Sequence, residues 1–204
     1  MQKSRLERLS PLTGLISVGL LLVGVVVFNN YDYLPSPEKV ANFLNDNATQ
    51  VTAGAYIALL ATFFLIWFTG SVRSVLVEHE GGTGMFSSIA FGAGIAAAIT
   101  LGISFVAMYA SGLRASAAGG ISPVGAVMMF DFWGQVTGQL FAICMAAFVA
   151  ATALVSLRTA LFPNWFSWVS LLIALGLLTP FAYIVLAFGL VWLVMVSIWL
   201  YLKG

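Results

Sequence analysis

The chain has 204 residues, of which 61% are hydrophobic and only 7% charged, and its formal net charge is +1. A soluble domain is typically ~45–50% apolar and ~25% charged, so this composition excludes a soluble globular protein and indicates an integral membrane protein. The small net charge also argues against nucleic acid as a partner, because phosphate binding needs a clustered basic surface.

Charge-free stretches locate the membrane crossings, because a helix needs ~20 apolar residues to cross the ~30 Å hydrocarbon core. Within a single transmembrane domain, residues 1–204, six spans are predicted at residues 11–28, 52–72, 85–109, 132–157, 162–179 and 181–202. Only helices and closed barrels satisfy the backbone in lipid, and these runs lack the alternation of barrel strands. We therefore predict an all-α, six-helix membrane bundle.

The basic residues predict the orientation, since Lys and Arg accumulate in cytoplasmic loops. With six spans and a cytoplasmic N-terminus, the inside set is larger than the outside set. The inside set is Lys3, Arg5, Arg8, Arg73, Arg158 and Lys203, and the outside set is Lys39 and Arg114. We expect a multi-pass protein of the cell membrane with both termini in the cytoplasm.

The first outside loop, residues 29–51, contains a helix-start pattern at Ser36-Pro37, because Ser can cap a helix and Pro suits its first position. Val40, Phe43 and Leu44 then fall on one face. This spacing predicts a short extracytoplasmic amphipathic helix on the membrane surface or on the bundle. It serves either as a cover over the helix ends or as a docking site for a partner.

The next two loops, residues 74–84 and 111–131, carry no site of defined chemistry. The inside loop contains the only histidine, His79, between two glutamates, and we interpret it as a solvated turn because no further ligand completes a metal site. In the outside loop Ser122-Pro123 is a second helix-start pattern. A helix from there to Leu157 would measure about 52 Å, so it would project outward or break near Gly134.

Small residues recur at every fourth position of the predicted fourth span, where they let another backbone approach closely. They are Gly134, Gly138, Ala142, Ala146 and Ala150, and the third span offers a partner surface at Gly94, Ala98 and Gly102. We expect a tight helix-packing seam between these spans. The pattern leaves open whether the seam lies within one chain or between two chains.

Gln135 and Gln139 lie one helical turn apart beside this ridge, with Thr137 between them. They form a candidate intramembrane polar site, either bonding helices together or lining a hydrophilic path. No Asp, Glu, Lys, Arg or His lies at mid-membrane in the predicted spans, where proton relays and ion-coupled transporters usually have one.

Several segments resemble a group of uncharacterised bacterial multi-pass membrane proteins defined only as a domain of unknown function. The segments are Leu9-Ser10-Pro11-Leu12-Thr13-Gly14, Glu38-Lys39-Val40-Ala41-Asn42-Phe43, Phe64-Leu65-Ile66-Trp67-Phe68, Phe91-Gly92-Ala93-Gly94 and Pro163-Asn164-Trp165-Phe166-Ser167-Trp168. The resemblance implies a six-helix membrane protein and implies no activity or site residue.

No pattern in the sequence indicates catalysis, a cofactor or a metal. We expect a non-enzymatic accessory subunit or assembly component, with the lipid bilayer and other membrane-protein subunits as partners. The alternative is a small-solute or lipid transporter or channel, for which Gln135, Gln139, Thr100, Ser104 and Pro180 are the polar or helix-breaking candidates.

Overall fold

The computed structural model describes residues 8–28 and 36–203, and these ranges contain helices and no strands. The elements are η1 (Ser10–Leu12), α2 (Thr13–Phe28), α3 (Pro37–Asp46), α4 (Ala48–Glu80), α5 (Met85–Ser116), α6 (Pro123–Gln135), the π-helical turn η2 (Val136–Phe141), α7 (Ala142–Thr159), α8 (Asn164–Leu177) and α9 (Ala182–Lys203). The prediction of an all-α protein is confirmed for the described residues.

Five helical runs within the described ranges are long and apolar enough to cross a membrane: Ser10–Phe28, Ala48–Glu80, Met85–Ser116, Pro123–Thr159 and Ala182–Lys203. The chain is accordingly a membrane protein. The sixth crossing, predicted at residues 162–179, is not confirmed. Its helix α8 has 14 residues, or about 21 Å at ~1.5 Å per residue, which is shorter than a ~30 Å core.

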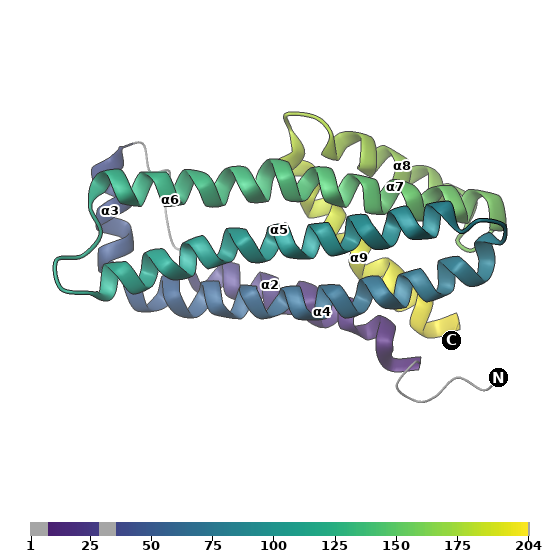
Figure 1. Ribbon diagram of the computed structural model, residues 1–204, viewed down its shortest axis with the longest axis horizontal. Coiled ribbons are helices and arrows are strands. Elements are labelled where there is room, and N and C mark those ends of the chain that lie inside the picture. Colours follow the sequence, from purple (N-terminus) through teal and green to yellow (C-terminus); the bar gives the residue numbers. More distant parts are fainter. Residues whose placement is uncertain (1–7, 29–35, 204) are drawn as a thin grey trace.

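The long helices lie side by side, and the two ends of the bundle differ (Figure 1). α4, α5 and the continuous run from α6 to α7 extend along its whole length, whereas α8 and α9 form a hairpin that covers only one part. α3 crosses the opposite end, where the α5–α6 loop also lies. The start of α2 and the end of α9 share the end that holds the α4–α5 turn.

Local sequence explains where two helices begin. Ser36 accepts a hydrogen bond from the amide of Lys39 at the start of α3, and Ser122 accepts one from Gly125 at the start of α6, each with Pro at the first helical position. The helix start predicted at Ser122 is therefore confirmed. Most of the loop predicted at residues 111–131 is wrong, because α5 continues to Ser116 and α6 begins at Pro123.

α3 carries its apolar side chains on its packed side. Val40, Ala41, Phe43 and Leu44 are buried, while Lys39 is exposed. Residues 29–35 of the same predicted loop, like Lys3 and Arg5, lie outside the described residues. α3 packs mainly on α6 and α5, at the end of the bundle remote from α8 and α9.

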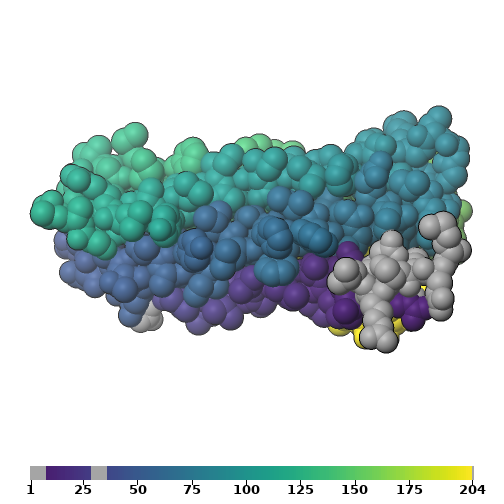
Figure 2. All heavy atoms as spheres, turned by 60° about the horizontal axis from the view of Figure 1, so that its bottom comes forward, coloured from purple at the N-terminus to yellow at the C-terminus, as the bar shows by residue number. Residues whose placement is uncertain are grey.

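A close backbone approach joins α2 to α4 at two glycines. A Cβ atom on Gly54 would lie 2.6 Å from the carbonyl oxygen of Gly24, and one on Gly24 would lie 2.6 Å from the carbonyl oxygen of Gly54. Figure 2 shows α2, α4 and α5 lying side by side in this order on one face of the molecule. Glycine is needed at both positions because any side chain would push the two helices apart.

Hydroxyl groups inside the bundle are mostly satisfied by nearby carbonyl groups. Thr69 donates to Leu65 O at 2.8 Å and Thr152 to Phe148 O at 2.8 Å, each one turn back in the same helix. Ser17 is an exception with a structural consequence, because it donates to Ala61 O on the neighbouring helix at 2.8 Å. Such bonds let small polar residues stay buried in an apolar interior.

Candidate functional site

The small residues of the predicted seam are buried or half-buried, but Gly94, Gly102 and Gly138 face other helices than the sequence led us to expect. Gly94 of α5 packs against Thr69 of α4, and a Cβ atom on Gly102 would lie 3.6 Å from Thr62 Cγ2 of α4. On the other helix Gly138 packs against Tyr183 of α9. The seam's alanines Ala98, Ala142 and Ala146 are buried, and Ala150 is half-buried.

The Gly134–Gly138 part of the ridge therefore receives a side chain and not a helix backbone. The ring of Tyr183 fills the space beside Gly138, and its hydroxyl donates a hydrogen bond to the carbonyl oxygen of Gly134. Tyr183 lies in the first turn of α9, so this contact ties the α8–α9 turn to the middle of the long Pro123–Thr159 helix. Sequence reasoning missed Tyr183, because no local pattern pairs it with a glycine 45 residues earlier.

A π-helical turn, η2, occupies this same stretch and separates α6 from α7 without breaking the helix. The helix thus neither ends nor breaks near Gly134, and the wide turn accommodates its continuation. π-helical turns inside α-helices are rare and occur often at functional sites.

Two buried polar atoms on this segment have no hydrogen-bond partner within the described ranges: the hydroxyl of Thr137 and the indole nitrogen of Trp133. Thr137 differs in this respect from Thr152 in the regular α7, whose hydroxyl reaches the carbonyl four residues back. Unsatisfied buried polar atoms are uncommon in native proteins and mark strained or functional positions.

Asp131, Gln135 and Gln139 form a stripe along the outward side of the segment, which we call the polar stripe. They follow one another at intervals of four residues, and all three are exposed. None of the three side chains forms a hydrogen bond or ion pair with any described residue. Hydrogen bonding between helices, one of the two roles that the sequence indicated for Gln135 and Gln139, is therefore absent from the described residues.

Aromatic rings define the level of the polar stripe along the bundle. The ring of Trp133 lies 5.3 Å from that of Phe28, the last residue of α2, and 6.5 Å from that of Phe105 in α5. Gln135 and Gln139 follow Trp133 toward α7. They consequently lie alongside α2 and not beyond its end.

The other polar candidates for a transport path do not converge. Thr100 and Ser104 are buried in α5 and donate to carbonyl groups of their own helix at 2.7–3.0 Å. Pro180 lies in the turn between α8 and α9 and does not interrupt a spanning helix. Thr100 and Ser104 therefore pack in the interior, and Pro180 belongs to the connection between two helices.

The α4–α5 turn holds one built carboxylate contact. Glu80 accepts hydrogen bonds from the amides of Phe86 (2.8 Å) and Ser87 (2.7 Å) and from the Ser87 hydroxyl (2.5 Å), so it caps the first turn of α5. Burial raises the pKa of the Glu80 carboxyl, but these hydrogen bonds and the nearby Arg158 leave the pKa below its ordinary value.

The adjacent His79 ring bonds to Val75 O at 2.8 Å. No three His, Cys, Asp or Glu side chains in the described part of the chain gather to hold a metal ion.

Comparison of the chain with protein-family models, with curated proteins and with solved structures found no match.

Proposed function

We propose that the protein is a non-catalytic component of a membrane complex, and that the polar stripe binds a transmembrane helix of a partner subunit. The observation that carries this proposal is the exposure of Asp131, Gln135 and Gln139, none of which has a side-chain partner among residues 8–28 and 36–203.

The segment formed by η1 and α2 supports the proposed position of the membrane. Its apolar run Ser10–Phe28 has 19 residues, or about 28 Å, which matches the ~30 Å hydrocarbon core. Ser10 pairs with the hydroxyl of Ser71 at one boundary, and Phe28 lies against Trp133 at the other. Tryptophan is enriched at such boundaries.

The charges support an N-terminus on the cytoplasmic side. Arg8, Arg73, Arg158 and Lys203 belong to the end of the bundle where α2 begins, and Lys39 and Arg114 to the other end. Because basic residues favour the cytoplasmic side, the α2 start and α9 end face the cytoplasm. In this arrangement the short α8 is a sixth segment that enters the membrane but crosses only part of it. The end with α3 and the α5–α6 loop projects outward.

The depth of the stripe follows from its spacing. Gln139 is six residues beyond Trp133 and therefore lies about 9 Å inside the outer boundary, and Gln135 lies about 3 Å inside it. Asp131 precedes Trp133 and reaches the headgroup region. The two amides consequently face lipid hydrocarbon unless another molecule covers them.

An amide that faces hydrocarbon without a hydrogen bond is unfavourable by roughly 2–7 kcal/mol. Hydrogen bonds between membrane helices contribute about 0.6–1.7 kcal/mol each, so two amides supply about 1–3 kcal/mol toward association. The exposed Phe132, Leu140 and Ile143 add an apolar surface beside the amides for van der Waals packing. A partner helix with Ser, Thr, Asn or Gln side chains fits this surface.

Gentle detergent extraction from native membranes, followed by mass measurement, tests the proposal. We expect a second membrane protein to co-purify at a fixed ratio. The Gln135→Leu, Gln139→Leu double variant should lower its recovery about tenfold, as expected for a loss of about 1.4 kcal/mol. Gln50→Leu is the matched control, because it makes the same change at an exposed position of α4 and should leave recovery unchanged.

A photo-crosslinking residue at position 139 gives an independent measurement, with position 172 on the exposed side of α8 as control. Crosslinking of the same protein from position 139 alone supports the proposal. Recovery of the chain alone, or crosslinking only between copies of it, contradicts a partner subunit. Equal recovery from the double variant and from Gln50→Leu contradicts the role of the stripe.

A further inference from the structure

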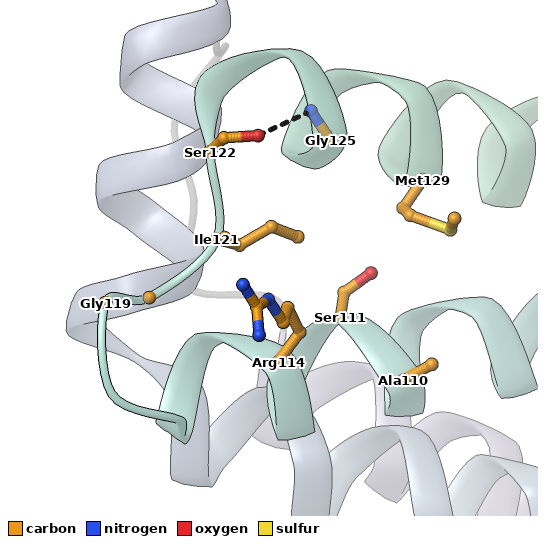
Figure 3. Close-up of a pocket in the computed structure, with 9 residues that line it drawn as sticks. Ala110, Ser111, Arg114, Gly119, Ile121, Ser122, Gly125 and Met129 are labelled. Atoms are coloured by element: carbon orange, nitrogen blue, oxygen red, sulfur yellow. Dashed lines mark hydrogen bonds between the residues drawn. The ribbon is translucent and has the colours of Figure 1, made fainter.

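A pocket of about 440 Å³ opens at the outer end of the bundle, between the last turns of α5 and the first turns of α6 (Figure 3). Arg114 and Ser111 line it from α5, Met129 from α6, and Ile121 and Ser122 from the connecting loop. In Figure 3 the Arg114 side chain extends from α5 toward Ile121, into the space between the two helices.

The loop that forms the pocket wall is held by α3. Asn45 accepts a hydrogen bond from the amide of Ile121 at 2.9 Å and donates one to its carbonyl oxygen at 3.3 Å. Gly119 and Gly120 adopt positive φ angles of 91° and 63°, and a Cβ on Gly120 would lie 2.6 Å from Asn45 Oδ1. Because α3 fixes both the shape and the position of the loop, the pocket is part of the folded structure.

The chemistry of the lining is that of a site for an anion joined to an apolar group. Arg114 is the only ionisable residue among the nine that line the pocket, and it makes no ion pair with any described residue. Its guanidinium group matches the geometry of a phosphate through two parallel hydrogen bonds. Ala110, Ile121 and Met129 supply an apolar wall beside it.

The position of the pocket relative to the outer membrane boundary indicates that the anion belongs to the lipid surface. Ser111 lies six residues, or about 9 Å, beyond Phe105, whose ring contacts Phe28 at the outer boundary. Including the headgroups, a bilayer measures ≈ 40–45 Å around its ~30 Å core, so the headgroup region extends about 5–7.5 Å beyond the boundary. It reaches the inner wall of the pocket at Ala110, and Arg114 lies about one helical turn further out. We propose that the pocket binds the phosphate of an anionic phospholipid of the outer leaflet at Arg114. Its acyl chain then descends past Met129 and Ala110.

This inference rests on the membrane placement proposed above, but not on the partner helix, and its test is separate. The protein is reconstituted in nanodiscs of phosphatidylcholine containing phosphatidylglycerol and released into native mass spectrometry. We expect one retained phosphatidylglycerol per chain. Arg114→Gln should lower this retention at least tenfold, while Lys39→Gln, which removes an exposed cation from the same end of the bundle, should not.

Arg114→Lys keeps the charge but not the planar group, and intermediate retention is expected. Asn45→Ala frees the loop and should also lower retention, whereas Asn42→Ala on an exposed side of α3 should not. Equal retention by Arg114→Gln and the unaltered protein overturns the proposal. Thermal protection by inorganic phosphate that equals protection by phosphatidylglycerol also overturns it, because the ligand would then be a soluble anion. Partner recovery should be the same in Arg114→Gln and the unaltered protein, so the two proposals can fail independently.

Discussion

Replacement of Gly54 by alanine should separate α2 from α4. The new Cβ would lie 2.6 Å from the carbonyl oxygen of Gly24, 2.8 Å from the Cβ of Phe28 and 2.9 Å from its amide nitrogen. All three are main-chain or first side-chain atoms, which cannot rotate away. Ordinary contact begins at about 3.4 Å, so the helices must move apart by about 0.8 Å.

The magnitude of the loss follows from that displacement. Overpacking of this kind costs about 1–3 kcal/mol, and a gap of 0.5–1 Å removes roughly a quarter to a half of the dispersion energy of each contact. The hydrogen bond from Ser17 to Ala61 O, now 2.8 Å, would lengthen beyond bonding range, at about 1 kcal/mol. Alanine regains about 1 kcal/mol of helix propensity, which leaves a net loss of about 1–3 kcal/mol.

Thermal unfolding in one detergent at one scan rate measures this effect. At roughly 2–4 °C per kcal/mol, the melting temperature should fall by about 2–12 °C. Gly19→Ala in α2 is the control, because a Cβ there meets no atom within 4 Å. It should leave the melting temperature unchanged or raise it slightly. A melting temperature for Gly54→Ala equal to that of Gly19→Ala would refute the reasoning.

Two other contacts yield predictions of the same kind. Gly138→Leu should destabilise the bundle because the new side chain would occupy the place of the Tyr183 ring. Adding Tyr183→Ala should restore part of this loss in the double variant. Strictly additive losses in melting temperature would show that the two residues do not meet. Glu80→Gln should lower the melting temperature at neutral pH, while Glu78→Gln, exposed on the same helix, should not. The pKa of Glu80 is lowered in the folded protein, so the stabilisation that its carboxylate supplies is present above the ordinary carboxyl pKa and is lost as pH falls through the lowered pKa. The difference in melting temperature between Glu80→Gln and the unaltered protein should therefore vanish in acid. A difference that persists in acid would contradict the assignment to the carboxylate.

The spans could be predicted from the sequence because charge is excluded from hydrocarbon. The prediction of 11–28 agrees closely with the apolar run Ser10–Phe28, but 52–72 is shorter than α4, Ala48–Glu80. The difference has a physical reason: a charged residue such as Arg73 marks where lipid ends, but a helix continues into water until a residue such as Gly81, with φ 63°, stops it. Charge spacing locates the membrane and not the helix ends.

The neighbours of each helix were less accessible to sequence reasoning. The spacing of Gln135 and Gln139 places them on one side of a helix. The other sides of that helix carry apolar and small residues, so the sequence does not indicate which side faces outward. The approach of α2 to α4 has a signal in the sequence, since Gly54 and Ala58 repeat the small-residue spacing found in the fourth predicted span. The partner glycine, Gly24, has no such repeat and is identified only by the structure.

The packing of α9 against α2 bears on the order in which the protein assembles during synthesis. Most neighbouring helices in the bundle are also consecutive in the chain, so each new helix meets the previous one as it is made. The contact between Gly14, near the start of α2, and Ser197, near the end of α9, differs because it joins two helices that lie far apart in the sequence. At about 5–20 residues per second, a ribosome needs on the order of ten seconds or more between these two residues. During this interval one flank of α2 must be shielded by lipid or by the insertion machinery, and a chain that lacks its last helix would leave that flank uncovered permanently.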